Sequence, residues 1–263
     1  MGLFDKKYCD ICGEKIGLFG NRKLEDGNMC KHCAKKLSPW FDDRRHSTLE
    51  EIKEQLAYRE ENKKAVADFR CSLELGENPR ILFDENAGTF MVSAPGSAED
   101  RAEENPDVFS LDQVTGADMD VDEYHSELYR EDRDGNKVSY NPPRYRYTYR
   151  FYINIKLSHP YVDDIRFQLN QYGLEIERTG SSTFSLFGDS FNPNRDYEYR
   201  QYDGMGREII DHLLHGKRPE QPKEQVPQPE PVQPTETEFV VCPYCGSTTR
   251  KARFCENCGG HLE

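Results

Sequence analysis

The sequence predicts an α+β protein of several modules, with a small cysteine-rich module at each end of an antiparallel β body. Three observations predict this class. Eight of the nine cysteines fall into four Cys-x-x-Cys pairs, two near each terminus. Alternating polar and apolar residues, typical of strands, recur between about residues 80 and 169. A long helical pattern lies on each side of this β-rich stretch.

The cysteine pairs form two quartets. The first is Cys9, Cys12, Cys30 and Cys33, and the second is Cys242, Cys245, Cys255 and Cys258. Two thiolates separated by two residues can point at one ion, and two such pairs complete a tetrahedron with zinc–sulfur bonds of about 2.3 Å. We therefore expect these residues to be metal ligands, with two structural Zn²⁺ ions as the cofactors.

Other uses of paired cysteines fit the sequence less well. Thioredoxin-type redox motifs use one pair beside a βαβ pattern, which no pair here has. Disulfides require an oxidising compartment, but the first seven residues contain no apolar segment of signal-peptide length. We therefore expect a cytoplasmic protein with reduced thiols. Iron in a rubredoxin-like cage uses similar turns and stays open as an alternative to zinc.

Charge is distributed unevenly along the 263 residues, whose net charge is −13 and mean hydropathy −0.90. Residues 1–46 carry ten Lys and Arg against seven Asp and Glu, residues 71–216 carry 14 against 28, and residues 242–263 have a net charge of +1. Nucleic-acid binding depends on clustered Lys and Arg, so we expect it only in the end modules. No apolar run approaches the roughly 20 residues of a membrane span.

The N-terminal module is predicted to span residues 1–46, with the layout of a treble-clef zinc finger. Gly13 follows the first cysteine pair and supplies the unusual backbone conformation needed there. A hairpin is predicted over residues 15–24, and a further turn leads to the second cysteine pair. That pair opens a short helix, which Pro39 ends. A module this small is expected to need its metal to fold.

This N-terminal segment resembles a bacterial cysteine-rich family, the domain-of-unknown-function family 4428. The resemblance rests on the motifs at residues 9–13, 23–27 and 30–33 and on the segment 47–53, and it covers about the first 65 residues. It implies a zinc-binding module. It implies no activity, because the family itself is uncharacterised.

A connecting helix is predicted over residues 47–70. Ser47 and Thr48 are N-cap candidates, each with a Glu three positions later. The apolar stripe of this helix is interrupted by Arg59 and Lys63, which suits a helix lying partly on the body.

The body is predicted to span residues 71–216 as an antiparallel β-barrel or sandwich with a C-terminal helix. Residues 95–107 read as a loop, and the Asp-rich run 118–123 as a solvated turn, because it does not match a calcium-loop template. The order of elements resembles bacterial pleckstrin-homology-like barrels in pattern. Strand and helix patterns cover residues 80–84, 89–92, 108–114, 124–129, 137–140, 145–157, 165–169 and 197–214.

Residues 217–241 are predicted to be a disordered linker, since six prolines alternate there with polar residues. Residues 242–263 resemble a short zinc-ribbon domain: two cysteine pairs, a Gly after each pair and an aromatic residue before the second. That resemblance implies a module for interaction or for nucleic-acid binding, and no reaction.

No catalytic residues are predicted. The nucleophile elbow, the P-loop and the dinucleotide fingerprint are absent from the sequence. We therefore expect a cytoplasmic zinc-binding adaptor that is not an enzyme and that binds another macromolecule, a protein, through its zinc modules and barrel. The alternatives are nucleic-acid binding by the basic zinc modules and, third, an enzyme with an unrecognised site in the barrel. The identity of the partner and the oligomeric state have no signal in the sequence.

Overall fold

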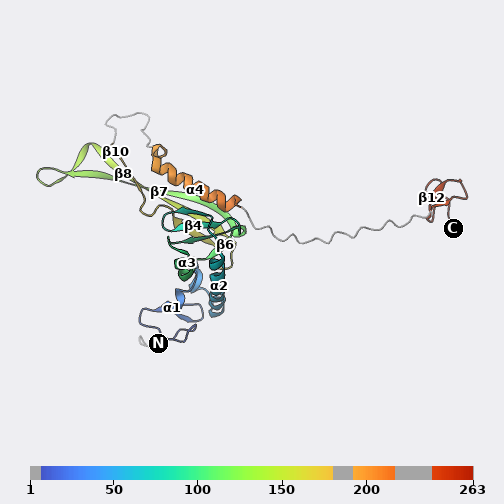
Figure 1. Cartoon of the computed structure of the whole chain (residues 1–263), viewed down its shortest axis with the longest axis horizontal. Helices are drawn as coiled ribbons and strands as arrows, with labels where there is room; N and C mark the ends of the chain where they lie inside the picture. The colour runs from blue at the N-terminus through green and yellow to red at the C-terminus, as the bar shows by residue number, and fades with distance from the viewer. Residues whose placement is uncertain (1–6, 180–191, 217–238, 263) are drawn as a thin grey trace. The chain divides into compact units, whose positions relative to one another are not determined.

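The computed structural model describes residues 7–179, 192–216 and 239–262. The chain divides into two compact units, Met1–Pro219 and Glu220–Glu263. The first unit combines helices with two four-stranded sheets and a small cysteine-rich module, and the second is a small cysteine-rich module alone (Figure 1). The protein therefore has the mixed helix-and-sheet character and the two terminal cysteine clusters that the sequence predicts.

The N-terminal module contains a short hairpin followed by one turn of helix. β1 (Asn21–Lys23) pairs antiparallel with β2 (Asn28–Cys30), and α1 (Lys31–Ala34) follows directly. The hairpin predicted over residues 15–24 is wrong, because the two strands that pair flank the turn between Lys23 and Asn28. The observed pairing places Leu24 and Met29, both fully buried, in the core of the module, whereas the predicted one relied on turn residues alone.

Helix α2 (Leu49–Asp68) occupies most of the segment predicted to be helical. The Thr48 hydroxyl accepts a hydrogen bond from the Glu51 N–H, and the Glu51 carboxylate accepts one from the Thr48 N–H at 2.7 Å. This reciprocal capping fixes the start of the helix. Ile52, near that start, is fully buried in the core of the cysteine module, and Val66, near the end, is also buried.

Two antiparallel sheets form the body of the first unit. One has the strand order β3 (Leu73–Gly76), β4 (Arg80–Asp84), β5 (Thr89–Ser93) and β6 (Val108–Ser110). The other has the order β10 (Leu174–Thr179), β8 (Lys137–Leu157) and β7 (Val114–Glu131), with β9 (Asp164–Gln168) also paired to β8. Apolar side chains of both sheets meet in one core.

The sheets do not close into a barrel, so of the barrel or sandwich that we expected, the barrel is wrong. A closed barrel requires every strand to pair on both sides, but among the described strands β7 and β10 pair only with β8. Helix α4 (Tyr197–His215) covers the core instead, with Ile209 and Leu213 fully buried in it. No described helix is long and apolar enough to cross a membrane.

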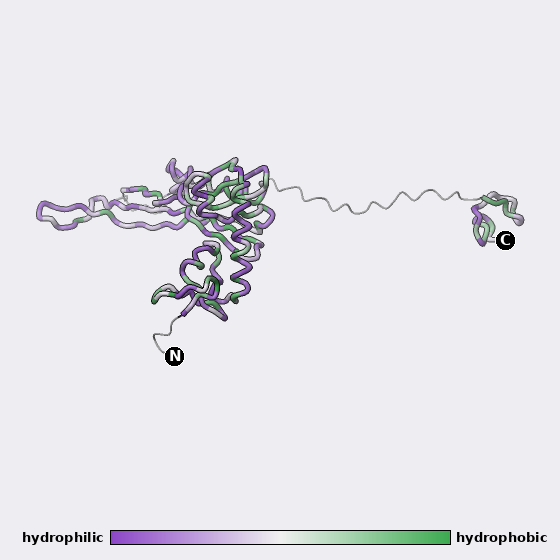
Figure 2. The backbone as a smooth tube through the Cα atoms, turned by 60° about the horizontal axis from the view of Figure 1, so that its bottom comes forward, coloured by the Kyte–Doolittle hydropathy of each residue, from purple (hydrophilic) through white to green (hydrophobic). Residues whose placement is uncertain are grey.

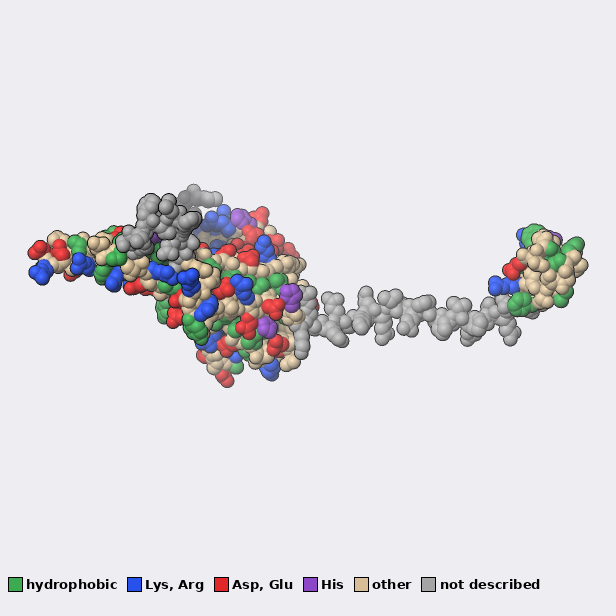
Figure 3. Space-filling model, turned by 90° about the horizontal axis from the view of Figure 1, so that it is seen from above, with side chains coloured by type: hydrophobic (Ala, Val, Ile, Leu, Met, Phe, Trp, Pro, Cys, Tyr) green, Lys and Arg blue, Asp and Glu red, His purple; other side chains and the backbone are tan. Residues whose placement is uncertain are grey.

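Strands β7 and β8 form a much longer hairpin than predicted, and its distal part projects from the body as an arm (Figures 1 and 2). The Asp-rich run 118–123, expected as a turn, is part of β7. Its aspartates alternate with Met119 and Val121, which pack against the core, so the run follows the period of a strand. Acidic and basic side chains are interspersed along the arm (Figure 3).

Further elements differ from the expectation, and β3 and β10 are among them, because no strand was predicted in either segment. α3 (Ala98–Glu104) lies in the segment that we expected to be a loop. The sequence signal for this helix was Ser97 followed three residues later by Asp100, because each side chain accepts a hydrogen bond from the backbone N–H of the other. β11 (Phe239–Val241) occupies the end of the predicted linker and pairs with β12 (Thr248–Arg250). The rest of that linker, residues 217–238, lies outside the described residues.

Candidate metal centres

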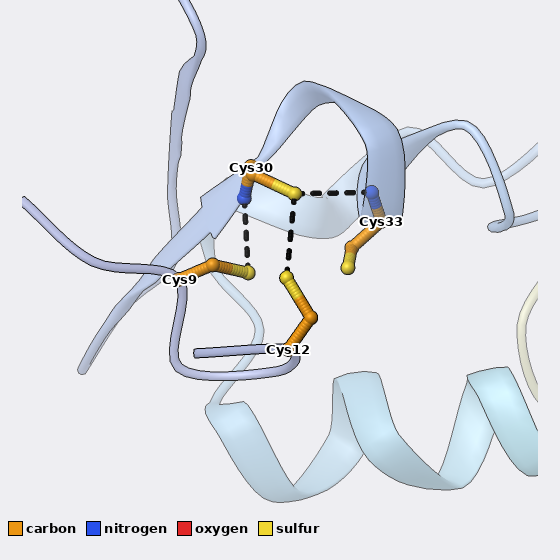
Figure 4. A group of neighbouring side chains, drawn as sticks. All are labelled: Cys9, Cys12, Cys30 and Cys33. Atoms are coloured by element: carbon orange, nitrogen blue, oxygen red, sulfur yellow. Dashed lines mark hydrogen bonds between the residues drawn. The ribbon is translucent and has the colours of Figure 1, made fainter. Parts of the chain in front are cut away.

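The first quartet lies between a tight turn and the start of a helix (Figure 4). The Cys9 sulfur accepts a hydrogen bond from the Cys30 N–H at 3.2 Å, and the Cys30 sulfur accepts one from the Cys33 N–H at 3.3 Å. Cys30 is the N-cap of α1, so the helix start itself orients this pair. Cys9, Cys30 and Cys33 are buried, and Cys12 is exposed.

The second quartet lies between two turns of the C-terminal module. The Cys242 and Cys258 sulfurs are 3.6 Å apart, and those of Cys245 and Cys255 are 3.8 Å apart. Cys242 and Cys255 are buried together with Leu262, against which Val240 packs. This set is nearly the whole core of the module, so few apolar contacts hold it together.

Three of the four cysteine pairs share one backbone turn conformation. In each, a glycine follows the second cysteine with a positive φ of 73–74°, and its N–H donates to the carbonyl of the first cysteine. A side chain would strain such a conformation, so the sequence pattern Cys-x-x-Cys-Gly encodes the turn locally. These glycines are Gly13, Gly246 and Gly259. The remaining pair, Cys30 and Cys33, uses the helix start instead.

The sulfur–sulfur distances fit a metal ion held by four thiolates. A tetrahedron with metal–sulfur bonds of about 2.3 Å has edges of about 3.8 Å. The Cys12–Cys30 distance is 3.8 Å, the two distances in the second quartet agree with it, and within each quartet all four sulfurs lie within 4.8 Å of one another. A disulfide would require about 2.05 Å, and all nine cysteines are free.

The thiols of the first quartet have unequal acidities. Burial raises the pKa of Cys9, but N–H donors of Cys12, Cys30 and Ile11 stabilise its thiolate and hold that pKa at about 7. Burial and the neighbouring thiols raise the pKa of Cys33 well above its ordinary value. Four adjacent thiolates repel one another, so all four ionise together only when a cation neutralises them.

The thiols of the second quartet also have unequal pKa values. The backbone N–H and the hydroxyl of Ser247 lower the pKa of Cys245 to about 6. The Gly260 N–H lowers the pKa of Cys258, but the adjacent thiols of Cys245 and Cys242 outweigh it and raise that pKa to about 12. Each quartet is thus suited to a soft divalent cation, which favours the thiolate form.

A buried ion pair, which we did not predict, links the first module to the body. The Arg59 guanidinium binds the Asp107 carboxylate, and their side chains are 7% and 0% exposed. The Ser38 hydroxyl donates to the same carboxylate at 2.7 Å, and the Arg59 Nε donates to the Lys36 carbonyl at 3.2 Å. Residues just after the first quartet are therefore bonded to α2 and to the segment before β6.

Two buried amides complete this interior polar cluster. The Asn62 side-chain amide donates to the Pro106 carbonyl at 2.7 Å, and its oxygen accepts from the Val108 N–H at 3.0 Å. The Asn105 amide donates to the Arg59 carbonyl at 3.0 Å. The signal in the sequence was the spacing of Arg59, seven residues after Ile52 and seven before Val66, which places it on the buried face.

Comparison with known proteins gives a family match over part of the chain. No curated protein and no solved structure matches the chain. A family model described as Domain of unknown function (DUF4428) matches residues 7–55, which include the first quartet and the first turns of α2. The resemblance of the N-terminal segment to that family is confirmed over these residues.

Proposed function

We propose that this chain is a cytoplasmic, non-enzymatic zinc adaptor: both quartets hold structural Zn²⁺, and the protein binds another protein. We assign the first module to the treble-clef type and the second to the zinc-ribbon type. The four thiolate ligands in each quartet support a structural metal. Catalytic zinc is typically held by three protein ligands and keeps its fourth coordination position open for water or substrate. The near-absence of another core in the second module supports the same role.

The protein-binding role is supported by the apolar side chains that are exposed on the surface of the C-terminal module. Phe239 and Val241 are 62% and 66% exposed, and Tyr244 and Phe254 are 72% and 56% exposed. Phe239 and Val241 alternate along β11 with Val240, which packs inward, so they share the outer face of the small sheet. Exposed apolar side chains on so small a module, two of them on one face of its sheet, are typical of an interaction site.

Nucleic-acid binding is the weaker candidate for the body of the chain. The stretch from Arg144 to Arg150, where arginines alternate with aromatic residues, is the segment most like a base-stacking platform. In the structure Arg146 pairs with Glu175 and Glu177, and Arg150 lies over the ring of Tyr124. These arginines have partners within the protein, and the surrounding body carries twice as many acidic as basic residues.

The test is capture of proteins from a nuclease-treated lysate of the native host by the immobilised full chain. We expect Phe239→Ser combined with Val241→Ser to reduce capture of a specific protein about tenfold, which corresponds to about 1.4 kcal/mol. The control is Tyr172→Ser, which removes a residue 83% exposed on the body. The proposal fails when the double variant captures the same proteins as the native chain while keeping its metal, or when nuclease abolishes all capture.

A further inference from the structure

A basic pocket of about 300 Å³ lies on the N-terminal module, beside the first quartet. Four cationic side chains line it, those of Arg22, Lys31, Lys35 and Arg44, and no carboxylate does. Phe41 and Leu37 contribute apolar lining, and Ser38 contributes a polar one. Four like charges around one small cavity repel one another, so the arrangement favours a bound anion.

None of the four cationic groups is paired with a carboxylate of the described residues, and the two guanidinium groups are also held in place. Among the described residues, no carboxylate lies within salt-bridge distance of any of the four. Backbone carbonyls orient the two guanidinium groups instead: the Arg44 Nη1 donates to Lys23 at 2.6 Å, and the Arg22 Nη1 donates to Asn21 at 3.3 Å. Each guanidinium has five N–H donors, so donors are left for a ligand.

Acidic residues close to the pocket in sequence do not line it. Asp42 and Asp43 line a separate pocket, and Asp43 binds His46 at 2.7 Å. Asp107 lies behind Ser38, but Arg59 balances its charge. Burial and repulsion from Arg22 and Arg45 lower the pKa of Arg44, so Arg44 lies close to other positive charges.

We propose that this pocket binds the phosphate groups of a small phosphorylated ligand, a free diphosphate or a nucleotide. Arg22 and Arg44 supply planar donors suited to phosphate oxygens, and Lys31 and Lys35 supply point charges. The volume is at the small end of ligand sites. The acidic body beside it repels a long polyanion, which favours a small ligand over a nucleic-acid strand. The inference does not depend on the proposed adaptor role.

The experiment titrates the full chain with inorganic pyrophosphate by calorimetry at about 150 mM salt, with zinc content measured before and after. We expect saturable binding that Lys31→Gln combined with Lys35→Gln weakens at least about tenfold, because two cationic contacts are lost. The matched control is Lys15→Gln combined with Lys36→Gln. It removes the same charge from exposed positions of the same module outside the pocket, and we expect it to change affinity less than about twofold.

A second arm identifies the source of the phosphate. A nucleoside diphosphate that binds more tightly than pyrophosphate assigns the pocket to a nucleotide, whereas equal affinity assigns it to a free phosphate compound. Three results overturn the proposal: no saturable binding, equal losses in the two double variants, or heat that accompanies loss of zinc.

Discussion

Removing the charge of Asp107 is predicted to destabilise the first unit strongly. The substitution Asp107→Asn keeps the shape of the side chain and its contact with Ser38, but it leaves the Arg59 guanidinium buried without its counter-ion. Arg59→Met has the complementary effect, because it keeps an apolar stem and leaves the carboxylate unpaired. Both variants test whether the interior polar cluster joins the cysteine module to the body.

The size of the effect follows from the burial of the pair. Breaking a buried ion pair by removing one partner costs about 3–5 kcal/mol. With a urea slope of about 2–3 kcal/mol per molar, the unfolding midpoint should fall by about 1–2.5 M. The exposed pair of Arg80 and Glu74, whose side chains are 38% and 40% exposed, is the control. We expect Glu74→Gln to change stability by less than about 1 kcal/mol.

The assay is urea unfolding of the full chain followed by circular dichroism, with metal content held constant. The double variant Arg59→Met with Asp107→Asn should be destabilised less than the sum of the single variants, since neither partner is then left charged and alone. A midpoint shift for Asp107→Asn no larger than that for Glu74→Gln would contradict a stabilising role of the buried ion pair, as would strict additivity in the double variant.

Three further predictions follow from other parts of the structure. Ile209→Ala, on the buried face of α4, should cost about 2–5 kcal/mol in urea unfolding, and the exposed Glu208→Ala should have little effect. Cys33→Ser and Cys255→Ser should each remove one metal ion per chain. Because the chain divides into two compact units, only Cys33→Ser should lower the urea midpoint of the first unit, and equal losses of that midpoint in the two variants would contradict this. Burial lowers the pKa of His159, and its Nδ1 accepts a hydrogen bond from a backbone N–H. The unfolded chain therefore binds a proton more readily, and stability should fall as the pH drops below 6.5; His159→Phe should reduce that loss, and identical pH profiles would refute the assignment.

The parts of the fold that were predictable are those encoded by neighbouring residues. Each Cys-x-x-Cys-Gly turn sets its own backbone, and the Thr48–Glu51 cap sets the start of α2, so both are visible in sequence. Sheet closure was not predictable, since it depends on pairing between distant strands. The Arg59–Asp107 pair joins residues 48 positions apart and was missed for the same reason.

The spacing of the aspartates in β7 led us to predict a turn where the structure has a strand. The aspartates from Asp118 to Asp122 resemble a solvated turn when read alone. The residues between them, Met119 and Val121, pack against the core, which makes the run one face of a strand. The basic pocket likewise draws on side chains that are far apart in sequence, from Arg22 to Arg44, so only the fold brings them together.

Elemental analysis of the full chain, purified without added metal, decides whether the two quartets hold zinc. The structure places two groups of four thiols at the sulfur spacing of a tetrahedral thiolate site. We expect about two zinc ions per chain, because a Cys₄ site binds zinc tightly enough to keep it through purification. One ion or none per chain would contradict the account, and iron in place of zinc would replace it with a rubredoxin-like one.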